Sequence, residues 1–149
     1  MRPAAMEDWF LINDLFTRYA TSLDRGDVDA VVACFTVDGS LTSPALGTFS
    51  GLGGIRDFAE RTARLKRDHG AQFRHVLSNL RVEVEVDRAR ATCYLLDFVT
   101  RDGETELLSP GEYVCTLRRT RGEWLFESRL VQMDRRFAVK NMTDEEAAC

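Results

Sequence analysis

The chain has 149 residues, of which 44% are hydrophobic and 30% charged, and this composition predicts one globular domain over 1–149 with a sizeable core. A net charge of −4 and a pI of about 5.2 argue against a nucleic-acid or anionic-membrane partner. No apolar run approaches the roughly 20 residues that span a bilayer, and residues 1–10 lack a signal-peptide core, so we expect a cytoplasmic protein.

The sequence contains no metal-binding pattern. Its four cysteines, at positions 34, 93, 115 and 149, form no Cys-x-x-Cys pair, and the first three lie in apolar rows that predict small buried side chains. The two histidines, His69 and His75, are too few for a typical ligand set. We therefore expect no metal. The abundance of Arg and Ala over Lys is typical of a bacterial source.

Residues 10–35 predict two helices separated by Gly26, the second of them capped by Asp27 and running over 28–35. Two residues of the first helix fit simple packing poorly. Tyr19 lies on the apolar stripe, where its hydroxyl needs a partner. Asp24 lies in the last turn, where the helix dipole disfavours an anion by about 0.3–1 kcal/mol. Five residues separate the two, or about 140° of rotation, so they share a site only if Asp24 turns inward at the helix end.

The rest of the chain predicts a short hairpin, one helix and a long antiparallel meander. Residues 40–49 suggest the hairpin, and 54–68 form an amphipathic helix with Phe58 and Thr62 on its stripe. The expected strands are 73–86, 89–100, 104–119 (interrupted at 109–111) and 123–134. This order predicts an α+β fold in which about three helices pack on a curved, mainly antiparallel sheet around a cone-shaped pocket. We expect residues 1–5 to be loose, the core to span about 7–135, and 138–149 to form a polar tail.

His75 and Asp97 are the most informative polar residues of the predicted strands. His75 shares strict alternation with apolar Leu77 but also with Arg81, a conflict that a bulge near residues 78–79 would resolve. Asp97 occupies an otherwise apolar row, where an unpaired carboxylate is too costly to persist. If residues 87–88 form a two-residue loop, position 97 faces 78, and the bulge brings His75 near Asp97. A His–Asp pair is one interpretation; a purely structural contact of Asp97 with Arg129 or a backbone amide is the other.

Arg129 is a further candidate, in the last predicted strand. It could bind a substrate carboxylate or carbonyl, or pair with Glu127 or Glu112 across strands, which is the commoner role of an Arg in a sheet. The glycine-rich stretch at 50–54 lacks the lysine of a phosphate loop and predicts a turn that opens the third helix.

These motifs resemble a known family. The Tyr-x4-Asp of the first helix, the following Arg-Gly-Asp, and Arg74–Asn79 running into Val82-Glu83-Val84 are similar to the SnoaL-like branch of the nuclear transport factor 2 superfamily. Within it the chain resembles the scytalone dehydratase and bile-acid dehydratase group. That resemblance implies a pocket with Tyr19, Asp24 and His75, with Asp97 as the partner of His75. It also implies substrate contacts from Arg129 and from three aromatic residues, Phe16, Tyr94 and Tyr113.

The resemblance implies an enzyme that needs no cofactor. Its leading form is a lyase, a dehydratase in which His75, held by Asp97, removes a proton next to a carbonyl of an apolar cyclic or polyketide-like substrate. Tyr19 would donate a hydrogen bond to the enolate oxygen, and Asp24 would position the leaving hydroxyl or the Tyr19 hydroxyl. A polyketide cyclase or ketosteroid-type isomerase shares the first step. A non-catalytic ligand-binding or dioxygenase small-subunit-like protein is the alternative of another class. An open curved sheet also predicts a homodimer or homotrimer.

Overall fold

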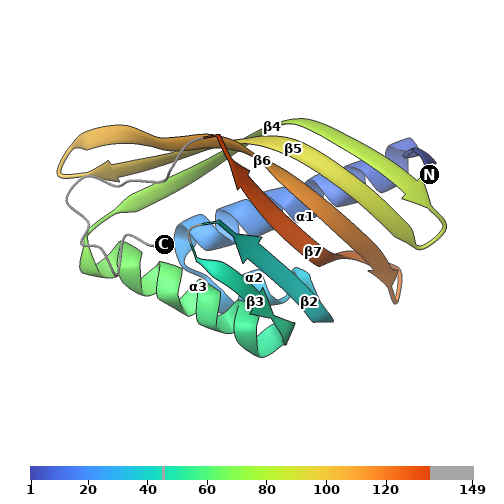
Figure 1. The fold of residues 1–149 in the computed structure, drawn as a ribbon, viewed down its shortest axis with the longest axis horizontal. Coiled ribbons are helices and arrows are strands. Elements are labelled where there is room, and N and C mark those ends of the chain that lie inside the picture. Colours follow the sequence, from blue (N-terminus) through green and yellow to red (C-terminus); the bar gives the residue numbers. More distant parts are fainter. Residues whose placement is uncertain (45, 135–149) are drawn as a thin grey trace.

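The computed structural model describes residues 1–44 and 46–134 (Figure 1). Its helices are α1 (Met6–Arg25), α2 (Val28–Val32) and α3 (Gly51–Asp68). Its strands are β1 (Arg2–Pro3), β2 (Phe35–Ser43), β3 (Gly47–Ser50), β4 (Gln72–Glu85), β5 (Arg88–Arg101), β6 (Glu104–Thr120) and β7 (Glu123–Met133). The predicted α+β class is confirmed. The expected polar tail at 138–149 lies outside the described residues.

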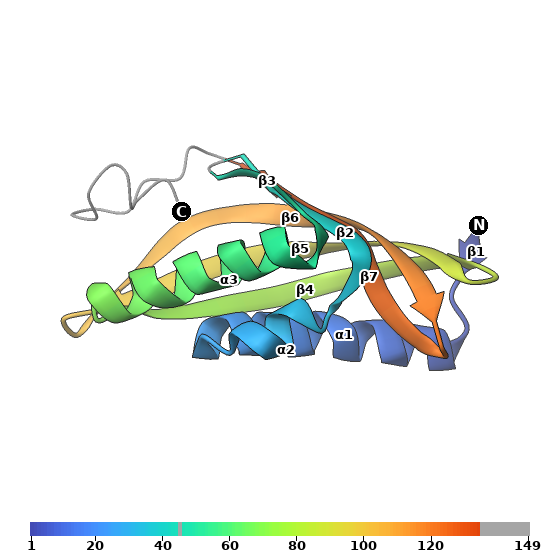
Figure 2. The same ribbon diagram turned by 90° about the horizontal axis from the view of Figure 1, so that it is seen from below.

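The strands form one curved sheet in the order β1-β4-β5-β6-β7-β2-β3. All neighbours are antiparallel except β2 and β7, which run parallel, so the sheet is mixed. The helices lie together on one side of the sheet (Figure 2), where α1 contacts β4 and β7 and α3 contacts β2 and β3. We expected residues 1–5 to be loose, but Arg2 and Pro3 form β1. This strand pairs with Val84 and Glu83 of β4.

The end of α1 is set by local hydrogen bonds. Gly26 adopts a left-handed conformation (φ 75°), and the amides of Gly26 and Asp27 donate to the carbonyls of Leu23 and Ser22. The Asp27 side chain then caps α2 by accepting from the amide of Ala30, as predicted. The second helix is shorter than expected, because the chain enters β2 at Phe35.

A bulge in β4 decides which side chains face the helices. Asn79 and Leu80 together oppose only Cys93, and Asn79 has a φ of 57°. His75 on one side of the bulge and Val82 on the other therefore face the same side of the sheet, as the sequence predicted. The β4–β5 loop lies one residue earlier than expected, since Glu85 pairs with Arg88. Together, the earlier loop and the bulge place His75 directly opposite Asp97.

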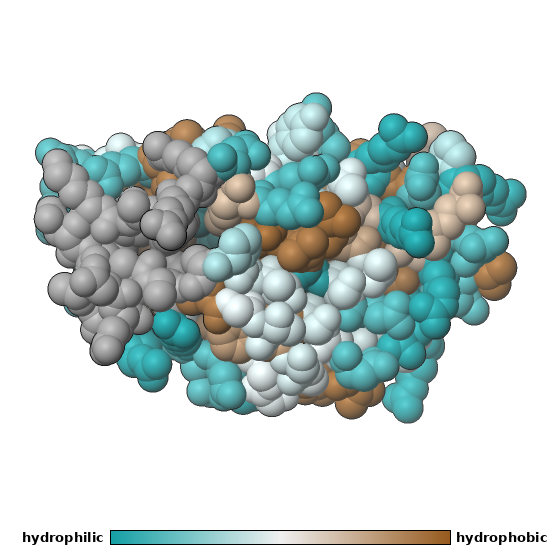
Figure 3. Space-filling view, in the orientation of Figure 1, coloured by the Kyte–Doolittle hydropathy of each residue, from teal (hydrophilic) through white to brown (hydrophobic). Residues whose placement is uncertain are grey.

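The core lies between the sheet and the helices. It includes the side chains of Ile12, Leu15, Leu41, Leu117 and Phe126, none exposed by even 1%. Cys34, Cys93 and Cys115 are buried free thiols, as expected for small core residues. The face seen in Figure 3 is mainly hydrophilic with scattered apolar patches. Among the described residues, no helix combines the length and apolar character needed to cross a membrane.

Gly111 allows β6 and β7 to approach each other closely. A Cβ added there would lie 2.5 Å from the backbone oxygen of Gln132. We expect Gly111→Ala to lower the free energy of unfolding by about 1–3 kcal/mol, measured by urea denaturation, because the backbone must shift. Gly53→Ala is the control: it lies in α3 with open space around it, and we expect stabilisation of up to about 1 kcal/mol. Equal effects of the two substitutions would contradict this account of Gly111.

Candidate active site

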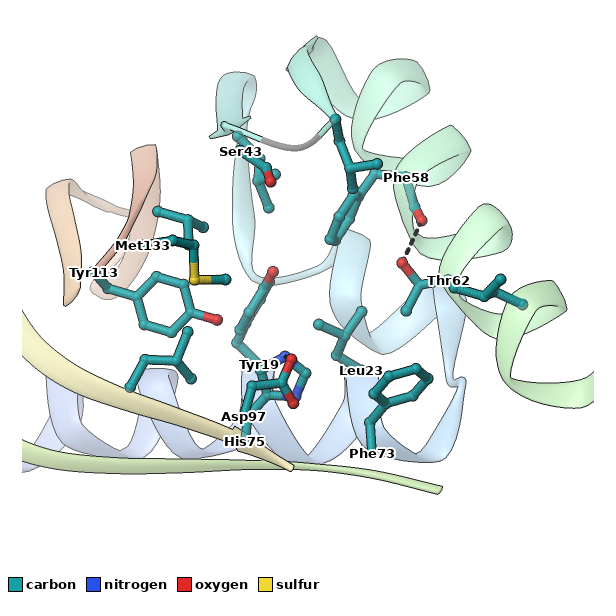
Figure 4. Close-up of a pocket in the computed structure, with 15 residues that line it drawn as sticks. Tyr19, Leu23, Ser43, Phe58, Thr62, Phe73, His75, Asp97, Tyr113 and Met133 are labelled. Carbon is teal, nitrogen blue, oxygen red and sulfur yellow. Dashed lines mark hydrogen bonds and ion pairs between the residues drawn. The ribbon is translucent and has the colours of Figure 1, made fainter. Parts of the chain in front are cut away.

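A pocket opens between the sheet and helices α1 and α3 (Figure 4). The space in and around it that no atom fills is about 650 Å³, open solvent included. Most of its wall is apolar, and the polar side chains that line it are Tyr19, Ser43, Thr62, His75, Asp97 and Tyr113. Among the described residues that line it there is no lysine or arginine.

His75 is held by Asp24. The ring Nδ1 of His75 lies 2.6 Å from Oδ1 of Asp24, and the backbone amide of His75 donates to Oδ2 over 3.0 Å. Both carboxylate oxygens of Asp24 are thus engaged by one residue. Because a carboxylate accepts hydrogen bonds, this contact fixes the neutral imidazole with its proton on Nδ1 and leaves Nε2 as the base.

Asp24 reaches His75 without leaving the helix. It lies four residues after Ala20 and eight after Phe16, on the same buried stripe of α1, and it is only 6% exposed. The expected inward turn at the helix end is therefore unnecessary. The backbone carbonyl of Asp24 accepts from the side chains of Lys66 and Gln72, which caps this end of α1.

Asp97 faces the other nitrogen of His75. Its Oδ2 lies 3.6 Å from Nε2, and its Oδ1 has no hydrogen-bond partner among the described residues. The two residues pair across β4 and β5, so their side chains share one face of the sheet. This geometry corrects the hypothesis from sequence, which made Asp97 the partner that holds His75 and had Asp24 position the leaving hydroxyl or the Tyr19 hydroxyl. Asp24 does not line the pocket, whereas Asp97 does.

The two titrating groups of the pocket have shifted proton affinities. Burial raises the pKa of Asp97 to about 6; the nearby His75 opposes this rise, and Asp24 adds to it. Burial by itself lowers the pKa of His75, but the carboxylates of Asp97 and Asp24 outweigh it, so the pKa of His75 lies above its ordinary value. His75 and Asp97 therefore titrate as a coupled pair, each affecting the pKa of the other.

Tyr19 of α1 and Tyr113 of β6 supply hydroxyl groups at another part of the pocket wall. In Figure 4 both hydroxyls point into the space above Asp97 and His75. Burial raises the pKa of Tyr19 to about 12 and that of Tyr113 well above 10, although Arg129 counteracts both shifts. Both phenols are therefore protonated at neutral pH and are able to donate hydrogen bonds to a ligand.

Arg129 lies behind this wall and does not line the pocket. It is 1% exposed, and none of the ion pairs between described residues involves it, so the expected pairing with Glu127 or Glu112 is not seen. Glu127 instead pairs with Arg88 and Arg118. A bulge at Glu127 in β7 turns Arg129 toward the core, since Ser128 pairs with Thr116 and Phe126 with Leu117.

Two expected substrate contacts are misplaced. Phe16 is buried beside Phe126, with ring centroids 5.1 Å apart, and does not reach the pocket. Tyr94 is 55% exposed and points away from it, because alternation along β5 turns Cys93 and Leu95 inward. Sequence reasoning missed Ser43 as a pocket residue, and it had assigned Thr62 only to a helix stripe. Thr62 lines the pocket while donating to the carbonyl of Phe58.

Across the described parts of the chain, no three His, Cys, Asp or Glu side chains cluster so as to hold a metal ion. The site has acid–base groups of its own. They comprise one oriented imidazole, one carboxyl group of raised pKa and two phenol donors around an apolar cavity.

Comparisons with known proteins agree with this architecture. An NTF2-like protein with a cystatin-like fold from Novosphingobium aromaticivorans is 27% identical, with a TM-score of 0.78 over 87% of this chain and 83% of that one. A candidate aromatic ring hydroxylase from the same organism is 25% identical, with a TM-score of 0.79 over 97% and 99%. A candidate scytalone dehydratase, also from that organism, is 19% identical, with a TM-score of 0.75 over 87% and 86%, and shows the shared fold.

The comparison with curated proteins gave no match. The model of the SnoaL-like domain matches residues 4–130, which cover nearly all of the helices and the sheet around the pocket. The chain therefore belongs to the SnoaL-like domain family, whose fold is NTF2-like.

Proposed function

We propose that this protein is a cofactor-independent lyase that removes water from a neutral, mainly apolar cyclic or polyketide-like ketone. The observation that carries the proposal is His75, whose Nδ1 is fixed by Asp24 and whose Nε2 faces the pocket beside Asp97. A buried and oriented imidazole of this kind is suited to general-base catalysis near neutral pH. The fold shared with a candidate scytalone dehydratase supports the same reaction class.

The first step is removal of a proton from the carbon next to the carbonyl group, or from its vinylogous position. The C–H electron pair moves into the substrate to form an enolate, and the proton goes to Nε2 of His75. The positive charge that develops on the imidazole is stabilised by Asp24 at 2.6 Å and by Asp97 at 3.6 Å. The hydroxyls that point into the pocket, led by that of Tyr19, donate hydrogen bonds to the enolate oxygen.

The second step expels the β-hydroxyl group. The enolate electrons form the carbon–carbon double bond, the C–O bond breaks, and the oxygen takes a proton to leave as water. The proton comes from imidazolium His75, directly or through Asp97, whose pKa of about 6 suits it to carry one. Oδ1 of Asp97 is buried and has no hydrogen-bond partner among the described residues. After the reaction, His75 and Asp97 together hold the same number of protons as before it.

The lining defines the class of substrate. Leu23, Phe58, Phe73, Leu95 and Met133 suit an apolar ring system. The buried carboxyl group of Asp97 disfavours a carboxylate or phosphate, and the described part of the lining contains no lysine or arginine to bind one. We therefore expect a ketone without charged substituents.

Replacement of His75 tests the base. We expect His75→Gln to lower the rate of α-proton exchange and of enone formation by about 10²- to 10⁴-fold, because Gln keeps a donor for Asp24 but offers no base. The rates are measured in D₂O on a panel of neutral cyclic β-hydroxyketones, by ¹H NMR and by ultraviolet absorbance. His69→Gln, which changes the other histidine at the end of α3, should leave both rates unchanged.

The outcomes separate the candidate functions. Exchange without water loss, still dependent on His75, would favour an isomerase or cyclase. Binding of the ketones without exchange by the native protein would indicate a non-catalytic ligand-binding protein. Native rates in His75→Gln would overturn the assignment of the base.

The raised pKa of Asp97 also predicts how stability depends on pH. Because the folded protein holds the Asp97 proton more tightly than the unfolded chain, ionising Asp97 opposes folding once the pH rises above about 4, and fully so above about 6. Asp97→Asn should therefore raise the free energy of unfolding at pH 8–9 by about 1–3 kcal/mol and change it little at pH 4. Urea denaturation at both values checks this, and a loss of stability at pH 8–9 would contradict it.

A further inference from the structure

Arg129 is a buried cation with no anionic partner among the described residues. Its exposed fraction is 1%, and its Nη1 donates to Sγ of Cys115 over 3.5 Å. Its Nε and Nη2 have no hydrogen-bond partner in the described part of the chain. Arginine remains protonated in proteins, so a full positive charge lies in the core. Nothing in the acid–base mechanism of His75 uses it directly.

Aromatic rings surround this guanidinium. Its Cζ lies 3.6 Å from the ring centroid of Tyr113, 4.0 Å from Tyr19, 4.6 Å from Phe126 and 5.0 Å from Phe16. All four distances are within the range of cation–π attraction. The two nearest rings are those whose hydroxyls enter the pocket, while the phenylalanines complete the enclosure behind them.

We propose that Arg129 is a positioning residue that acts on the pocket through Tyr19 and Tyr113. A cation against the face of a phenol ring stabilises negative charge that moves onto its oxygen. Each O–H group is then a stronger hydrogen-bond donor toward an oxyanion in the pocket. Arg129 thereby brings positive charge to the reaction without offering a cation that would bind a substrate carboxylate.

A merely structural role does not account for this arrangement. A buried charge with unpaired N–H groups costs desolvation energy, and an apolar side chain of similar length would fill the same space without that cost. The direct substrate contact expected from the sequence also fails, because the aromatic rings lie between Arg129 and the cavity. The catalytic consequence rests on the proposed function, whereas the effect on the phenols does not.

The chain offers a direct test because it contains only three tyrosines, Tyr19, Tyr94 and Tyr113. Replacing all three with 3,5-difluorotyrosine lowers the phenol pKa values into a range where folded proteins are stable, and ¹⁹F NMR then follows each titration. Single Tyr→Phe variants assign the signals. The exposed Tyr94 serves as the internal reference in every sample.

We expect Arg129→Met to raise the titration midpoints of Tyr19 and Tyr113 by about 1–2 pH units, or to move them beyond the folded range, because a unit charge a few ångströms away is lost. Tyr94 should titrate as before. Arg118→Met is the matched control, an arginine of β6 paired with Asp38 and Glu127 at the surface, and should change none of the midpoints.

Unchanged midpoints of Tyr19 and Tyr113 in Arg129→Met would overturn the proposal. If that variant does not fold, Arg129→Gln and Arg129→Lys replace it: Gln should raise both midpoints, and Lys, which keeps the charge, should raise them less. Equal midpoints in these two variants would again overturn it. Unchanged midpoints alongside an intact His75-dependent reaction would refute only the role of Arg129, whereas a protein without that reaction but with shifted midpoints would refute only the lyase.

Discussion

The contact between Asp24 and His75 is the interaction on which the candidate site depends. It joins the last turn of α1 to the open edge of β4, where β1 covers only Glu83 and Val84. One carboxylate satisfies an edge amide of the sheet and orients the imidazole, and these bonds offset the unfavourable position of an anion at a helix C-terminus. Lys66 and Gln72 hold the same helix end through its carbonyl group, so α1, α3 and β4 meet at one point.

The residues of this site could be predicted from the sequence more completely than their arrangement. Each of four residues departs from a simple pattern. Tyr19 puts a hydroxyl on an apolar stripe, and Asp24 puts an anion in the last turn of a helix. His75 lies where strand alternation breaks, Asp97 is an acid in an apolar row, and the structure brings all four together. The five-residue separation of Tyr19 and Asp24 does not place them on one face of the helix. The stripe from Phe16 through Ala20 to Asp24 instead places Asp24 against β4, while Tyr19 faces the pocket.

Register explains most of the remaining differences. The bulge at residues 79–80 was predictable because alternation fails there. The bulge at Glu127 was not, because both alternating rows of β7 mix polar and apolar residues, so neither row marks the inward face. Because of that second bulge, Arg129 no longer faces the same side of the sheet as Leu125. Its side chain instead lies among the aromatic rings that surround it in the core. The exchange of roles between Asp24 and Asp97 also depends on three-dimensional contacts, because either acid could pair with His75 on sequence grounds. The parallel pairing of β2 with β7 has no local signal at all.

The protein is a SnoaL-like domain with a mainly apolar pocket. Asp97 contributes a carboxyl group to the pocket wall, and the cation of Arg129 lies behind the ring of Tyr113. The central claim is that Asp24 fixes the imidazole so that Nε2 of His75 is the free base facing the pocket. ¹⁵N NMR of the imidazole groups tests it directly, since the chain has only two histidines. Above the pKa of His75, the account predicts a protonated Nδ1 and a bare Nε2; a neutral His75 with its proton on Nε2 would contradict it.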